Sequence, residues 1–61
     1  MQTRFLTRYQ VAEILAVSVG TVDGLIRRGE IPAVRVGSSV RVSEEGLSEF
    51  VQKHGAGRVY V

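Results

Sequence analysis

The sequence predicts a small α+β domain with the order helix, helix, β-hairpin, helix. Three observations lead to this expectation: two successive segments with apolar residues at helical spacing, a valine-rich alternating segment after Pro32, and a last segment that starts acidic and ends basic. The chain has 61 residues and no cysteine. It is therefore expected to form one domain that depends on its apolar core.

The first helix is expected to begin after Thr7. Thr7 and Gln10 have the spacing of a capping box, in which each side chain accepts a hydrogen bond from the backbone of the other residue. Val11, Ile14 and Leu15 then form an apolar stripe at positions i, i+3 and i+4. We expect this stripe to face the core.

The second helix repeats this arrangement after about three residues. Ser18 is a strong N-cap, and Gly29 can end the helix in the left-handed conformation. Between them, the apolar stripe consists of Val22, Leu25 and Ile26. So short a connection is typical of a helix-turn-helix. Two helices joined this tightly cannot bury both stripes by themselves, so a third element must cover them.

A β-hairpin is expected after Pro32. A two-residue turn at 37–38 would place the valines of this segment on opposite faces, whereas a three-residue turn at 37–39 places all of them on one face. We expect the three-residue turn, which leaves Arg35 and Arg41 as neighbours on the outer face. The valines are Val34, Val36, Val40 and Val42.

The last helix is expected to be capped by Ser43. Acidic residues follow this cap and basic residues lie near position 54, so the charges complement the helix dipole. Its apolar stripe consists of Leu47, Phe50 and Val51. The resulting order of helix, helix, two-stranded hairpin and helix is that of a winged helix-turn-helix, with the hairpin as the wing.

This domain is expected to span residues 1–54. Residues 55–61, "GAGRVYV", follow as a tail with a glycine hinge and an apolar tip. The tail is a candidate for contact with another protein, either as an added edge strand or packed on a neighbour's surface. The alternative is that it frays or folds back on its own domain. The residues concerned are Arg58, Val59, Tyr60 and Val61.

Positive charge is concentrated in the first two thirds of the chain. Residues 1–42 contain six arginines and three acidic residues, whereas residues 43–61 contain two basic and three acidic residues. All but one of the basic residues are arginines, whose planar guanidinium suits phosphate and guanine. The alternative is that these arginines are solvated surface residues.

The composition gives little support to catalysis, to a metal or cofactor, or to a membrane segment. The chain has one histidine and no spacing of Ser, His and acidic residues that builds a nucleophile and its base. No residues are grouped as metal ligands, and no segment approaches the roughly 20 apolar residues of a membrane span. We expect a cytoplasmic protein that is not an enzyme and needs no cofactor.

Five motifs carry a resemblance to a known family: "VAEIL", "VS", "TV", "LIRRGEIPAVRVG" and "VRV". Together they make the segment from Phe5 to Val51 resemble the small excisionase-type, MerR-like winged helix-turn-helix domain. The resemblance implies a module for double-stranded DNA, commonly an excisionase of a phage or integrative element that controls the direction of integrase-mediated recombination. It further implies binding and bending of attachment-site DNA, head-to-tail contacts between copies, a tyrosine integrase as partner, and a place at the bacterial nucleoid.

The resemblance places the start of the second helix and the wing at the DNA. Among the candidates, the wing arginines are the first choice, because a wing in the minor groove gains most from arginine. Arg4 and Arg8, near the first helix, are secondary candidates for backbone contact. The candidate DNA-binding residues are Ser18, Val19, Gly20, Thr21, Asp23, Gly24, Arg27, Arg28, Arg35, Ser38, Ser39 and Arg41.

The sequence departs from the family's pattern where bases would be read. Gly20 and Gly24 expose bare backbone. Asp23 repels phosphate. Its carboxylate either accepts a hydrogen bond from a cytosine amino group or is solvated or paired within the protein. Ala16 stands where the family's turn often has glycine and costs on the order of 1 kcal/mol if its backbone is left-handed. Weak base specificity is expected.

Three functions remain open. The first is an architectural excisionase, and the second is a stand-alone MerR-like transcriptional regulator with the same fold. The third is a protein-interaction adaptor that has lost DNA binding, which the two glycines and the net charge of +2 keep open.

Overall fold

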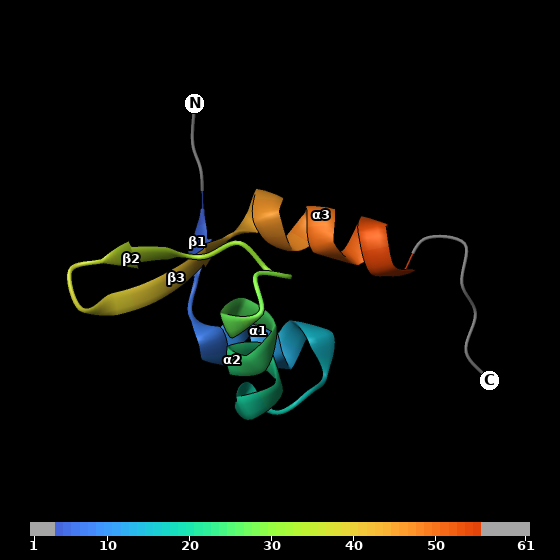
Figure 1. The fold of residues 1–61 in the computed structure, drawn as a ribbon, viewed down its shortest axis with the longest axis horizontal. Helices are drawn as coiled ribbons and strands as arrows, with labels where there is room; N and C mark the ends of the chain where they lie inside the picture. Colours follow the sequence, from blue (N-terminus) through green and yellow to red (C-terminus); the bar gives the residue numbers. More distant parts are fainter. Residues whose placement is uncertain (1–3, 56–61) are drawn as a thin grey trace.

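The computed structural model describes residues 4–55. Figure 1 shows the β2–β3 hairpin, which we call the wing (residues 34–43), projecting away from α3, with α1 and α2 below its base. The small α+β winged helix-turn-helix class is confirmed. The elements in chain order are β1 Phe5–Leu6, α1 Arg8–Leu15, α2 Val19–Arg27, β2 Val34–Val36, β3 Ser39–Ser43 and α3 Glu44–Gly55.

Helix α1 begins and ends through local hydrogen bonds. The Thr7 Oγ1 atom accepts from the Gln10 N–H at 3.0 Å, and the Gln10 Oε1 atom accepts from the Thr7 N–H at 2.8 Å, so the capping box is confirmed. At the other end, Ala16 has a φ of 58°, in the left-handed region. The Val17 N–H there donates to the Ala12 carbonyl at 3.0 Å. The hydrogen bonds that end the helix offset the free-energy cost of an alanine in the left-handed conformation.

Helix α2 follows at 108° to α1, an angle typical of a helix-turn-helix. The Ser18 Oγ atom caps α2 by accepting from the Thr21 N–H at 3.2 Å. Gly29 ends the helix with a φ of 78°, and the Glu30 N–H donates to the Leu25 carbonyl at 2.9 Å. Both ends of α2 therefore follow the expected capping rules.

The turn of the wing corrects the expected register. Val36 pairs with Ser39 and Arg35 pairs with Val40, so the turn has two residues rather than three. Gly37, the first turn residue, has a φ of 62°. Glycine at this position suits a type II′ turn, whose twist matches that of the flanking strands. The twist of the hairpin therefore outweighs the gain from gathering the valines on one face.

This register separates the two wing arginines. Val34 pairs with Arg41, and residues directly opposite in an antiparallel pair share a face. Arg35 lies on the other face with Val40, so the expectation that the arginines are neighbours on the outer face is wrong. Val34 and Val36 are exposed, because the tip of the wing extends beyond the core.

A short strand that the sequence analysis does not predict precedes α1. In β1, Phe5 pairs with Ser43 and Leu6 pairs with Val42, which gives an antiparallel sheet with the order β1-β3-β2. Two residues carry no periodic signal of their own. Their extended conformation is stabilised by the hydrogen-bonding edge that β3 offers.

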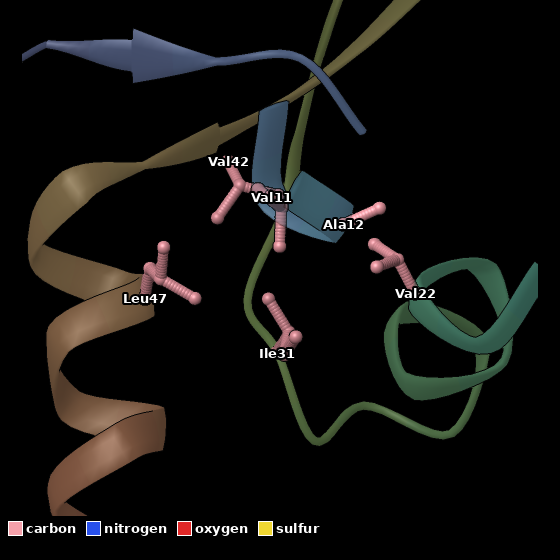
Figure 2. Close-up of a cluster of buried hydrophobic side chains, with 6 residues drawn as sticks. All are labelled: Val11, Ala12, Val22, Ile31, Val42 and Leu47. Carbon is pink, nitrogen blue, oxygen red and sulfur yellow. The ribbon is translucent and has the colours of Figure 1, made fainter. Parts of the chain in front are cut away.

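The core lies where α1, α2, β3 and α3 meet. Figure 2 shows side chains from these four elements converging with Ile31, which comes from the loop between α2 and β2. Partly buried apolar residues surround them, among them Leu15, Leu25 and Phe50. The buried residues are Val11, Ala12, Val22, Ile31, Val42 and Leu47.

Two residues expected in the core are on the surface. Ile14 is 58% exposed and Val51 is 45% exposed. In α1 the small Ala12 is buried instead, because α2 packs against that side of the helix. In α1 and α3, one residue of the expected i, i+3, i+4 stripe therefore lies outside the core.

Gly46 marks a close approach between α3 and the loop before β2. A Cβ atom at this position would lie 2.8 Å from the Pro32 Cγ atom and 3.0 Å from the Ser43 Oγ atom. The same Oγ atom caps α3 by accepting from the Gly46 N–H at 2.9 Å. Any side chain at Gly46 must therefore displace either the proline or the cap.

We expect Gly46→Ala to lower the free energy of unfolding by about 1–3 kcal/mol through overpacking. The matched control is Gly24→Ala in the interior of α2, where the new Cβ would meet only the flexible end of Arg28 at 3.4 Å. That substitution should raise stability by about 0.5–1 kcal/mol through helix propensity. Urea unfolding followed by circular dichroism measures both. Equal effects in the two variants would contradict the close packing at Gly46.

Candidate nucleic-acid interface

An open groove of about 640 Å³ lies between the start of α1, one side of α2 and the wing. Four arginines and one acidic residue contribute to its walls, so the groove carries an excess of positive charge. The lining residues are Thr7, Arg8, Tyr9, Asp23, Ile26, Arg27, Arg35, Ser38, Ser39, Val40 and Arg41.

Arg8 and Asp23 form an ion pair that joins α1 to α2 inside this groove. The Arg8 Nη1 atom donates to both carboxylate oxygens of Asp23, at 2.8 and 2.9 Å. The hydrogen bond and the charge of Asp23 raise the pKa of Arg8, so the guanidinium stays protonated. Of the interpretations left open for Asp23, the structure places it in an intramolecular pair.

Three further arginines line the groove without a carboxylate partner. Among residues 4–55, no acidic side chain lies within 4.0 Å of Arg27, Arg35 or Arg41. The Arg41 Nη1 atom instead donates to the carbonyl of Val40 at 2.9 Å. Three uncompensated positive charges around one groove favour an anionic ligand.

Arg28 is separated from this group. Its Nε atom donates to the Glu30 Oε2 atom at 2.9 Å, and it does not line the groove. The sequence placed Arg27 and Arg28 together as DNA-binding candidates. The helical rotation of α2 sends Arg27 to the groove and Arg28 to a local ion pair.

The start of α2 presents hydroxyl groups at the surface. The Ser18 and Thr21 side-chain oxygens lie 3.0 Å apart and share a hydrogen bond, and both residues are exposed. Val19, another candidate, packs partly buried against the core. Ser18 and Thr21 are therefore better placed than Val19 to meet a phosphate at the helix N-terminus.

The outward face of α2 is bare. Gly20 and Gly24 lie one helical turn apart on the side opposite the buried Val22. A Cβ atom at Gly20 would meet only the Ser18 Oγ atom, at 3.8 Å. No side chain from these two positions can reach a base edge. At the wing tip, Ser38 lines the groove with a short hydroxyl.

The secondary candidates near α1 differ from one another. Arg4 is highly exposed and lies 3.8 Å from Glu44, outside the groove. Arg8 is part of the groove wall, although the sequence indicated it only as a secondary candidate. The position of Arg8 in the first turn of α1 was visible in the sequence, but its contact with Asp23 joins residues 15 positions apart.

Other kinds of site find no support in the part of the chain that the structure describes. Within residues 4–55, no three side chains of His, Cys, Asp or Glu come together as a metal site. No single helix in the same range has the length and apolar composition needed to cross a membrane. The candidate protein-contact residues of the tail, Arg58, Val59, Tyr60 and Val61, lie outside the described residues.

The chain is similar to three proteins from two bacteria. It is 41% identical over 51 residues to "Putative DNA-binding protein MT0521" and "Putative DNA-binding protein Rv0500A" of two Mycobacterium tuberculosis strains, covering 84% of this chain and 65% of each relative. It is 45% identical over 49 residues to "Uncharacterized protein YvgK" of Bacillus subtilis, covering 80% of this chain and 16% of that protein. No solved structure matches the chain.

A family match covers almost all of the described structure. Residues 5–55 match the family described as "Helix-turn-helix domain", from the first residue of β1 to the last residue of α3. The matched range contains the tight α1–α2 connection, the wing and every residue of the arginine-lined groove. The chain therefore belongs to the helix-turn-helix family of DNA-binding domains.

Proposed function

We propose that this protein binds double-stranded DNA with α2 in the major groove and the wing on the neighbouring minor groove. The strand of phosphates between the two DNA grooves would then lie along the groove of the protein. The observation that carries this proposal is that Arg27, Arg35 and Arg41 all line this groove and have no carboxylate partner among residues 4–55. Arginine binds phosphate with its planar set of N–H donors.

The bare face of α2 supports recognition that depends little on base edges. A bidentate contact between arginine and guanine contributes roughly 1–3 kcal/mol of discrimination, and Gly20 and Gly24 supply none. Specificity would then come from the wing, from the shape and deformability of the DNA, and from neighbouring copies. Such recognition suits an architectural protein that bends its site.

We propose an excisionase role in which this protein binds and bends attachment-site DNA and directs a tyrosine integrase toward excision. It would act at the nucleoid in the cytoplasm of a bacterial host, without a cofactor and without catalysis of its own. Support comes from the family resemblance and from the weak base reading of a single copy. Footprinting on the attachment region of the element that encodes the protein tests this role.

A MerR-like transcriptional regulator is the second candidate, since the same fold and the same groove serve it equally. Protection of a promoter and not of an attachment region would favour it. The adaptor without DNA binding is disfavoured, because three of the four groove arginines, Arg27, Arg35 and Arg41, form no ion pair among residues 4–55.

Binding to a mixed-sequence duplex should weaken steeply with salt. Each phosphate that is neutralised contributes about −0.9 to the slope of log K against log salt concentration, so three groove arginines predict a slope of about −2.7. Fluorescence anisotropy of a labelled duplex between low and physiological salt measures this slope. The absence of binding at low salt, or a flat dependence, would refute DNA binding.

Arg35→Ala and Arg41→Ala should each weaken DNA binding several-fold. Neither side chain belongs to the core, so the thermal midpoint should stay nearly unchanged. Lys53→Ala is the matched control, because it removes one positive charge from α3, outside the groove. If the control loses as much affinity as the wing variants, net charge rather than the wing determines binding.

We also propose that Arg58, Val59, Tyr60 and Val61 contact a neighbouring copy bound head-to-tail on the DNA. Such a contact raises affinity without new base contacts. Deleting residues 56–61 should convert cooperative, laddered gel shifts into independent single-site binding. The thermal midpoint should change little, because the core described above is built from earlier residues. Full cooperativity in the truncated protein would exclude the tail as the coupling element.

A further inference from the structure

We infer that Arg8 binds a DNA phosphate and that Asp23 presents it to the groove, so that α1 holds the DNA backbone together with α2 and the wing. This inference rests on the proposed DNA binding. It adds a contact residue from the first helix and gives the acidic residue of α2 a role that is not base reading.

The geometry of the ion pair leaves most of the Arg8 guanidinium available. Both oxygens of Asp23 accept from the single Nη1 atom, at 2.8 and 2.9 Å. The Nε and Nη2 atoms carry the remaining three of the five N–H donors of an arginine. The Arg8 side chain is 35% exposed and forms part of the groove wall. A phosphate can therefore be bound without breaking the pair with Asp23.

Arg8 is also held in place before any ligand arrives. Asp23 holds the guanidinium from α2, and the ring of Tyr9 lies with its centroid 5.4 Å from the Arg8 Cζ atom. Immobilising a flexible side chain on binding costs roughly 0.5–1.5 kcal/mol. An arginine that is already fixed avoids most of this cost.

The position of Asp23 distinguishes this pair from the other ion pairs of the described residues. The pairs of Arg4 with Glu44 and of Arg28 with Glu30 lie outside the groove. Asp23 instead places a carboxylate in the wall of a groove that is otherwise basic, where it repels phosphate. The presence of the Asp23 carboxylate in this wall is explained if its role is to orient Arg8.

The competing explanation is that Arg8 only neutralises Asp23 and does not touch DNA. The two explanations are distinguished by measuring how the removal of Arg8 changes DNA affinity in a protein that also carries Asp23→Asn. Asparagine there keeps a hydrogen-bond acceptor for the Nη1 atom and removes the charge that would need neutralising. A loss of affinity for Arg8→Gln in this background that exceeds the loss from removing an arginine outside the groove is then due to a contact of Arg8 with DNA.

The experiment measures the affinity of the full chain for a mixed-sequence duplex over a salt series. The Asp23→Asn variant should bind at least as tightly as the parent chain. The double variant Arg8→Gln, Asp23→Asn should bind several-fold more weakly than Asp23→Asn, with a slope of log K against log salt that is less steep by about 0.9. Arg8→Lys in the Asp23→Asn background keeps the charge and should restore the slope.

Arg4→Gln in the Asp23→Asn background is the matched control, because it removes an exposed arginine outside the groove. It should change the slope less than Arg8→Gln does. Thermal unfolding of each variant shows whether the fold is retained. Equal losses for Arg4→Gln and Arg8→Gln would mean that net charge alone is measured, and would overturn the inference.

Two further outcomes separate this inference from the proposed function. If Arg8→Gln leaves the affinity and slope of Asp23→Asn unchanged, Arg8 only neutralises Asp23, and the inference is wrong while DNA binding stands. If neither the parent chain nor Asp23→Asn binds duplex DNA at low salt, the proposed function is wrong and the inference fails with it.

Discussion

The burial of Val42 in strand β3 is the constraint on which the rest of the structure depends. Helices α1 and α2 are joined too tightly to bury their apolar stripes by themselves, and Val42 of β3 completes the core together with Ile31 and Leu47. The same strand pairs with β1 through Leu6, pairs with β2 in the wing, and runs directly into α3 through the cap at Ser43. One strand therefore connects the core, the sheet and the last helix.

The groove follows from this arrangement. Because the inner end of β3 is fixed in the core, its outer end carries the wing past α2 and leaves an open space between them. The arginines around this space form no ion pairs that stabilise the fold, with the exception of Arg8 and its partner Asp23. Core packing and the charge of the groove are thus nearly independent of each other, which leaves the groove open to ligand binding.

One side of α2 packs in the core, and the other side faces the solvent. Val22 is completely buried, while Gly20 and Gly24 on the opposite side offer only backbone. Asp23 and Arg27, on the same helix, line the groove. The described surface of α2 therefore supplies charge to the groove, while its two glycines supply no side chain.

The sequence by itself determined the features that depend on residues three or four positions apart. The capping box at Thr7, the cap at Ser18 and the glycine end of α2 are local hydrogen-bonding arrangements, and they fixed the helices and the winged helix-turn-helix class. Only the tertiary structure decided the strand β1, the exposure of Ile14 and the pairing of Arg8 with Asp23. These depend on which surfaces meet across the fold, because local spacing does not reveal the partner that covers a face or neutralises a charge.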